Sequence, residues 1–439
     1  MLQTRRKILE GCVTKIAFRE KIMRIKSFIF SAVFVIPMFI GSIVYAENAR
    51  VGVLMPTSGG AAKSGQETLE AVKLAVDIIN NKYDIDLPFA RTEGLPNHGG
   101  AKIVMITEDH GGRPERGRAI AERMITQDKV HILQGAFHSS VCSPSSQVAE
   151  KMGIPYVTGT SESPALTARG FKTFFSVTPT ANDIARDFFS FLSEIGKEKG
   201  VPLKSVNVVH VNDVWGTGLA KAAKAIYQNY GFNSIKGIAY APNVADLKSE
   251  VLRLKGNNPD VVLQASFDAD AILSMRTYQS LRFAPKAILA MGAGFASPNF
   301  IKALGKNADY AYSHTKFHSD LIKTRPAAGQ VNAEYKKRAN KPIWDAPARA
   351  FTGMTVVADI LNRAKSFAPK DILAAARATN IKGSDTIMPY KGVRFNEKGQ
   401  NQLANGLITQ IQGGSHYPVW PKAIASKKAV FPAPGWDKR

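Results

Sequence analysis

Short motifs around glycine and serine are the first residues to test for catalytic chemistry. Gly159-Thr-Ser161 starts like the loop that presents a serine nucleophile in hydrolases, but Ser163 stands where that loop has its second glycine. Gly216-Thr-Gly218 starts like a dinucleotide-binding loop, and Lys221 replaces the third glycine of that loop. The phosphate-binding pattern Gly-x-x-x-x-Gly-Lys does not occur in the sequence. We therefore predict that the chain is not an enzyme and binds no cofactor, with an exported hydrolase as an open alternative.

Metal binding is the second chemistry that residue spacing could support. His314 and His318 are four residues apart, so they could share one face of a helix as metal ligands, with Asp320 nearby. We favour the other interpretation, exposed residues at a point where the chain crosses between two domains. Cys142 is the one cysteine after the first 46 residues, which excludes an internal disulfide there and a zinc site that needs two thiolates. We expect no metal.

A repeated strand-loop-helix pattern must position whatever polar residues the chain uses. Apolar stretches rich in β-branched residues alternate with helical patterns of ten or more residues, and the predicted strands are 50–55, 102–107, 130–134, 154–157, 206–211, 235–239, 261–264 and 287–290. Such alternation predicts parallel sheets with helices on both faces. A seam near residues 177–182 separates two series of strands. Near the carboxyl terminus we predict a hairpin of residues 392–395 and 403–411.

The loops that follow these strands are the predicted binding surface. In open parallel sheets, ligands bind beyond the carboxyl ends of the strands, where the strand order reverses. Two such sheets facing each other would form a cleft. The loops expected to line it are rich in small, polar or aromatic residues, and they are 56–60, 135–140, 158–163, 211–217, 265–268 and 291–295.

The first 46 residues resemble an export signal. Arg24 and Lys26 precede the apolar run 28–40, and small residues lead to Val44-Tyr45-Ala46. We expect cleavage before Glu47 and a periplasmic protein, while a retained membrane anchor and a true start at Met23 stay open. The rest of the chain is long enough for two domains.

The chain is strongly basic, with a formal net charge of +23. The lysine and arginine residues are scattered along predicted helices and loops, and no nucleic-acid-binding motif accompanies them. We predict a basic, solvated surface and no nucleic-acid partner.

Several short stretches, in this order and at this spacing, carry a resemblance to a known family: Ser58-Gly59 with Gly65, then 135–140, 153–156, 163–167, 212–216 and 392–399. They resemble the solute-binding proteins of ABC transporters, in the type I periplasmic family that includes the branched-chain amino-acid-binding proteins. The resemblance implies two doubly wound α/β lobes, joined by a three-crossover hinge, that close on a small ligand. It places residues 47–177 and 315–388 in lobe 1, and residues 178–314 and 389–439 in lobe 2.

The resemblance also implies roles for polar residues in the cleft. Ser139, Ser140 and the backbone N–H of Thr160 match the places that hold a ligand's α-carboxylate, beside a helix start. Helix capping is the alternative role for Ser139.

The ammonium site departs from the family pattern. Glu162 stands where the family has a hydroxyl for the α-ammonium, and Gly294 stands where it has an acid. A carboxylate at Glu162 or Asp268 could replace that acid. The alternatives are a solvated loop carboxylate for Glu162 and a helix cap for Asp268.

Aromatic residues complete the expected site. Trp215 and, more loosely, Phe267 match places where the family covers the ligand with an aromatic ring, although Trp215 could instead pack at a helix start. Ser64 matches another frequent aromatic position, which predicts a roomier pocket, and Ser58 belongs to the first predicted loop.

The resemblance predicts a non-catalytic periplasmic receptor of an ABC importer that captures an amino acid or a similar zwitterion or carboxylate. Its expected partners are that small molecule and an inner-membrane permease, and we expect a monomer. The alternative is an extracytoplasmic sensory or regulatory module of the same fold.

Overall fold

The computed structural model describes residues 47–323 and 325–439. The predicted export segment, residues 1–46, lies outside the described residues. Within the two described ranges, no helix combines the length and the apolarity that crossing a bilayer requires.

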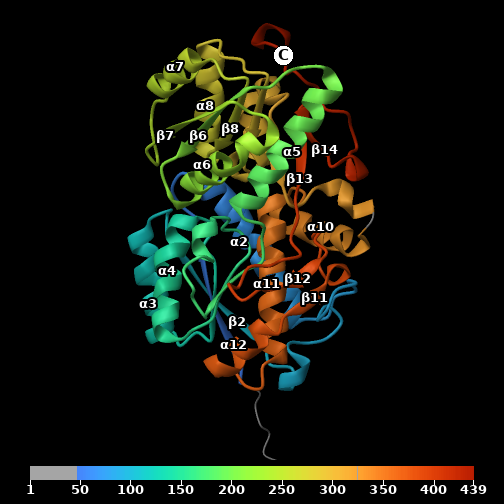
Figure 1. Cartoon of the computed structure of the whole chain (residues 1–439). Coiled ribbons are helices and arrows are strands. Elements are labelled where there is room, and N and C mark those ends of the chain that lie inside the picture. Colours follow the sequence, from blue (N-terminus) through green and yellow to red (C-terminus); the bar gives the residue numbers. More distant parts are fainter. Residues whose placement is uncertain (1–46, 324) are drawn as a thin grey trace, which may run out of the picture. The chain divides into compact units, whose positions relative to one another are not determined.

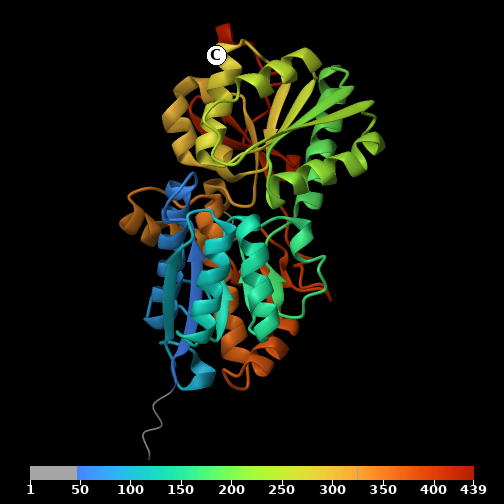
Figure 2. The same ribbon diagram turned by 90° about the vertical axis from the view of Figure 1, so that its left-hand side faces the viewer.

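The first lobe is built on a five-stranded parallel sheet with the order β2-β1-β3-β4-β5. Its strands are β1 (Ala49–Met55), β2 (Ile103–Asp109), β3 (Ile132–Gln134), β4 (Tyr156–Thr158) and β5 (Phe174–Ser176). Side chains of β1 alternate between the faces of the sheet. Val51 and Val53 join the apolar cluster of α2 (Ala62–Asn80) and α11 (Asp345–Arg363), whereas Leu54 joins that of α3 (Pro114–Thr126) and α4 (Ser139–Met152). Helices therefore cover both faces, and Figures 1 and 2 show α3 and α4 side by side.

The second lobe is built on a seven-stranded sheet with the order β14-β13-β10-β9-β8-β6-β7. Its first five strands in the chain are parallel, and the last two are antiparallel to their neighbours. The strands are β6 (Ser205–Val211), β7 (Ser234–Tyr240), β8 (Val261–Ala265), β9 (Ala287–Ala290), β10 (Tyr312–Thr315), β13 (Leu407–Gln412) and β14 (Ser415–Trp420). Its buried apolar cluster includes side chains from α5 (Ala181–Lys199), α6 (Val214–Ile226) and α8 (Asp268–Ser280). The remaining α-helices are α7 (Lys248–Asn257), α9 (Pro298–Leu304), α10 (Pro326–Ala339) and α12 (Pro369–Arg377).

The predicted fold class is confirmed. Every predicted strand overlaps a strand of the structure, and each sheet has helices packed against it. The chain passes between the sheets after β5, after β10 and again before β13, as a three-crossover hinge requires. The carboxyl ends of the parallel strands in each sheet are the edges at which a ligand site is expected.

The predicted hairpin of residues 392–395 and 403–411 is wrong. β12 (Gly392–Arg394) pairs with β11 (Asn380–Lys382), while β13 pairs with β10 and β14. The turn between β12 and β13 is bound to the first sheet, because Ser176 N donates to the carbonyl of Gly399 at 2.7 Å. This long-range bond holds the turn against β5 and separates the two strands.

The exact division of the chain between lobes stays a prediction. Tyr390, Val393 and Phe395 belong to the apolar cluster of α2 and α11 in the first lobe, although the resemblance implied that residues from 389 onward join the second. We propose that the last crossover lies between Phe395 and β13.

Candidate functional site

Ring side chains from the two lobes meet at the carboxyl ends of the strands. Phe137 and His138 follow β3, Trp215 lies in the first turn of α6, and Phe267 follows β8. The ring centroid of Phe267 lies 4.4 Å from that of His138, 4.7 Å from that of Trp215 and 6.3 Å from that of Phe137. The predicted aromatic pair Trp215 and Phe267 is therefore brought together, and His138 and Phe137 add rings from the first lobe.

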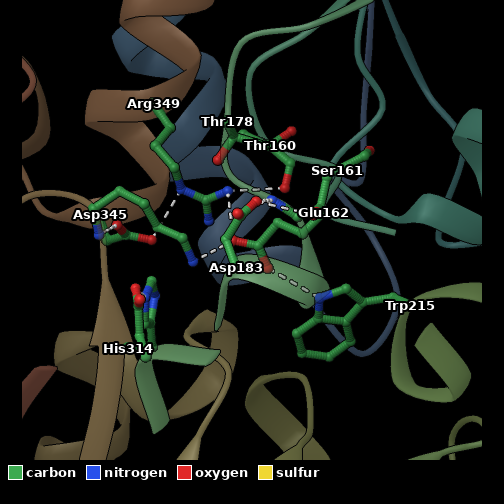
Figure 3. A network of polar contacts seen from close by, with 12 residues as sticks. Thr160, Ser161, Glu162, Thr178, Asp183, Trp215, His314, Asp345 and Arg349 are labelled. Atoms are coloured by element: carbon green, nitrogen blue, oxygen red, sulfur yellow. Dashed lines mark hydrogen bonds and ion pairs between the residues drawn. The ribbon is translucent and has the colours of Figure 1, made fainter. Parts of the chain in front are cut away.

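A group of four buried charged residues lies behind these rings, and we call it the charge cluster: Glu162, Lys316, Asp345 and Arg349 (Figure 3). Their exposed fractions are 3%, 0%, 1% and 4%, so all four charges are removed from water. Two carboxylates and two cations balance each other. Such a group is stable only while every charge keeps its partner.

The contacts within the charge cluster are specific. Glu162 Oε1 pairs with Lys316 Nζ and lies 3.3 Å from Arg349 Nη1. Arg349 Nε donates to Asp345 Oδ2 at 2.9 Å, and its Nη1 donates to the carbonyl of Thr160 at 2.8 Å. Burial alone would raise the pKa of Asp345, but the positive charges of Arg349 and Lys316 outweigh it and lower that pKa.

Glu162 connects the charge cluster to the aromatic rings. Its Oε2 accepts a hydrogen bond from Trp215 Nε1 of the second lobe at 3.0 Å. The alternative of a solvated loop carboxylate is wrong, since only 3% of Glu162 is exposed. Its role toward a ligand stays a prediction, because both oxygens already have partners in the protein.

The residues expected to hold a carboxylate lie around the start of α4. Ser139 is fully buried, and its Oγ accepts a hydrogen bond from Ser163 N at 3.3 Å. It does not cap the helix, because His138 occupies the N-cap position. The Oγ1 atom of Thr160 accepts from Phe137 N at 3.2 Å, which fixes the loop that carries the rings.

Ser58 serves the first loop of the structure. Its Oγ donates to Asp109 Oδ2 at 2.5 Å, and Thr57 N donates to Asp109 Oδ1 at 2.8 Å. Burial would raise the pKa of Asp109, but hydrogen bonds from Ser58, Gly111 and Thr57 lower it to about 2. These bonds explain the shape of the loop and do not place Ser58 in a cavity.

A cavity of about 550 Å³ lies where the loops of the two lobes face each other. The first lobe contributes Gly60, Ala61, Gly111, Gly112, Arg113, Pro114, His138, Ser140, Ser143 and Pro144. The second contributes Val211, Asn212, Asp213, Val214, Pro242, Asn243, Val244, Phe267, Ala269 and Asp270. Of the predicted site residues, Ser140 and Phe267 line this cavity. Asp213, Asp270 and His138 were missed as site residues, although all three lie in or beside predicted loops.

Gly294 lies in a place that excludes any side chain. An added Cβ atom would lie 2.4 Å from the carbonyl oxygen of Phe267 and 2.7 Å from the Cβ atom of Ala271. The acid that the resemblance implies at this position therefore has no room in this chain.

Asp268 is a partly exposed carboxylate with no cationic partner among the described residues. It is the first residue of α8, and Phe267 is the N-cap, so the capping alternative is wrong. Its Oδ1 and the nearby Oγ of Ser64 on α2 are buried without a hydrogen bond that meets normal geometry. Burial raises the pKa of Asp268 to about 6, although the nearby hydroxyls of Ser64 and Ser297 lower it.

We expect Asp268→Asn to stabilise the protein at pH 8 by about 1 kcal/mol and to give no gain at pH 4. The carboxyl has a higher pKa in the folded than in the unfolded chain, so its ionisation disfavours the folded state increasingly as the pH rises from about 4 to about 6. Urea unfolding at both pH values measures the difference, with Asp437→Asn on an exposed side chain as the control. Equal effects of Asp268→Asn at the two pH values would contradict the assignment.

The histidines considered as metal ligands do not converge. His314 lies in β10 and is fully buried, so its interpretation as an exposed crossover residue is wrong. Its Nε2 lies 2.9 Å from Asp187 Oδ2, whereas His318 Nε2 lies 2.9 Å from the carbonyl of His416. Over residues 47–323 and 325–439, no three His, Cys, Asp or Glu side chains are grouped to hold a metal ion.

Comparisons with known proteins agree with this architecture. The periplasmic binding protein family matches residues 48–415. The Leu/Ile/Val-binding protein homolog 7 of Brucella suis is 28% identical over 409 residues, which cover 91% of this chain and 98% of that protein.

Two solved structures share the fold. An ABC transporter solute-binding protein from R. palustris, in complex with benzoate, aligns with a TM-score of 0.72 and 18% identity over 88% of this chain and 98% of that one. The branched-chain amino acid transporter substrate-binding protein LivJ of Streptococcus pneumoniae, in complex with isoleucine, aligns with a TM-score of 0.70 and 17% identity over 84% and 98%. The predicted resemblance is confirmed, and the chain belongs to the periplasmic binding protein family.

Proposed function

We propose that this protein is the periplasmic solute-binding component of an ABC importer, and that it captures an amino acid or a related small zwitterion or carboxylate by hinge closure. The observation that carries the proposal is the cavity of about 550 Å³ lined by loops of both lobes. Its volume lies within the range of about 300–1,000 Å³ that is typical of small-molecule sites. Because three crossovers connect the lobes, a change in their angle would open or enclose this cavity.

The wall of the cavity supports an acidic group on the ligand. Ser140 and Ser143, from the first two turns of α4, line the cavity, and the N-terminus of a helix favours a negative charge. The names of similar proteins refer to leucine, isoleucine, valine and benzoate, all of which carry a carboxylate. We propose that the ligand's carboxylate lies against the start of α4.

The cellular setting follows from the same proposal. The predicted export signal in residues 1–46 would deliver the protein to the periplasm. There it would pass its ligand to an inner-membrane permease, acting as a monomer and without a cofactor.

A thermal-shift screen of the purified protein tests the proposal. We expect at least one of leucine, isoleucine, valine, phenylalanine and benzoate to raise the melting temperature by several degrees at saturating concentration, because a ligand that binds only the folded state stabilises it. Ribose, which has no carboxylate, is the negative control. Chemical turnover of a ligand would favour an enzyme, and no shift with any carboxylate would contradict the proposed function.

A further inference from the structure

The wall that the second lobe gives to the cavity is acidic. Asp213 is the N-cap of α6 and Asp270 lies in the first turn of α8, so both carboxylates lie at the carboxyl edge of the second sheet. Neither forms an ion pair with any described residue, in contrast to the buried Glu67, Glu162 and Asp345, which each have a lysine or arginine partner.

The hydrogen bonds of these two carboxylates are to neutral groups. Asp213 Oδ1 accepts from Trp215 N at 2.9 Å and from Gly216 N at 2.8 Å. Asp270 Oδ2 accepts from the hydroxyl of Tyr240. Burial raises the pKa of both carboxyl groups to about 6, so both are ionised at pH 7.5 at a cost that a cationic ligand would relieve.

His138 adds an unused hydrogen-bonding atom to the same cavity. The residue lines the cavity with 7% of its surface exposed, and its Nδ1 is buried without a partner. Burial lowers the pKa of His138 to about 3, so the ring is neutral and one of its nitrogens can accept a hydrogen bond. A buried polar atom left without a partner is costly, which indicates a ligand with a donor group.

The opposite wall has the other polarity. The start of α4 and the side chain of Arg113 lie on the first-lobe side of the cavity. Arg113 reaches its nearest carboxylate, Glu115, only at 4.0 Å. The cavity therefore has a positive wall and a negative wall, which fits a ligand that carries both charges.

We propose that the ligand carries a positively charged nitrogen, and that Asp213 and Asp270 bind this nitrogen while His138 Nδ1 accepts one of its hydrogens. The inference rests on the proposed function and narrows it from carboxylates in general to zwitterions. It assigns the cation to two residues that lie elsewhere than Gly294, where the resemblance implied the acid and where no side chain fits.

Matched ligand pairs test the assignment by titration calorimetry at pH 7.5. The pairs are leucine with 4-methylpentanoate and phenylalanine with 3-phenylpropanoate, each differing by the amino group alone. We expect the better amino acid to bind at least about 100-fold more tightly than its deaminated partner. Benzoate serves as an anion without an amino group.

Charge-removing variants then locate the cation site. Asp213→Asn keeps a good helix-capping side chain and removes the charge, so a purely structural role predicts little change. We expect Asp213→Asn and Asp270→Asn each to weaken the amino acid by about 10- to 100-fold and the deaminated partner by less than about 3-fold. Asp437→Asn, outside the cavity, should leave both affinities unchanged.

The outcomes separate this inference from the proposed function. Tight binding of benzoate or a deaminated acid, with the amino acid no better, would overturn the inference and leave the solute-binding proposal standing. Equal weakening of both members of a pair by Asp213→Asn and Asp270→Asn would overturn the assignment of the cation to these residues. Absence of binding by every carboxylate would overturn the proposed function and this inference together.

Discussion

Replacing Lys316 with methionine is expected to lower the free energy of unfolding by about 3–5 kcal/mol. The Lys316 side chain is fully buried, and its Nζ pairs with Glu162 Oε1. Methionine has a similar volume, so the packing is kept while the positive charge is lost. One buried cation, Arg349, would then face the two buried carboxylates of Glu162 and Asp345.

Urea unfolding at pH 7.5 measures this loss, and a surface pair provides the matched control. Lys337 Nζ lies 2.7 Å from Glu334 Oε1, but 69% of the Lys337 side chain is exposed. Lys337→Met should therefore cost less than about 1 kcal/mol. Adding Glu162→Gln to Lys316→Met should recover part of the stability, since it removes the unpaired carboxylate. A loss from Lys316→Met as small as that from Lys337→Met would show that the charge cluster does not stabilise the fold.

The sheets could be predicted because their signal is local. Strands such as β6 and β8 are continuous apolar runs, and each is followed by a helix pattern that begins with a capping or small residue. The wrong hairpin had the opposite cause. The turn after β12 binds to β5, more than 200 residues earlier in the sequence, and neither segment indicates the other.

The charge cluster could not be predicted from the sequence for a similar reason. Asp345 and Arg349 are four residues apart, a spacing that usually indicates an exposed ion pair on a helix surface. Lys316 follows β10, and its partner Glu162 follows β4, so their contact depends on how the lobes are connected. Phe267 and Ser140 were predicted because loops after parallel strands converge, whereas the contribution of His138 depends on the tertiary contact with Phe267.

Gly294→Ala is expected to lower the free energy of unfolding by about 1–3 kcal/mol, because one added methyl group has no space at this position. Gly294 is buried in the short 3₁₀-helix Ala293–Ala296. The new Cβ atom would lie 2.4 Å from the Phe267 carbonyl oxygen, a backbone atom that cannot turn away as a flexible side chain could. To make room, the backbone of Phe267 must shift, and its ring contacts with His138 and Trp215 shift with it.

The same substitution at Gly256 should have the opposite sign. Gly256 lies in α7, and an added Cβ atom there would meet nothing within 4 Å. Alanine at this exposed helical position should stabilise the protein by up to about 1 kcal/mol, because it favours helical conformations more than glycine does. Urea unfolding of both variants measures the contrast, and calorimetry with the best ligand shows whether Gly294→Ala also weakens binding by moving Phe267. If Gly294→Ala matched Gly256→Ala in stability, the position could accept a side chain, and an acid there would again be a candidate for the ligand's cation.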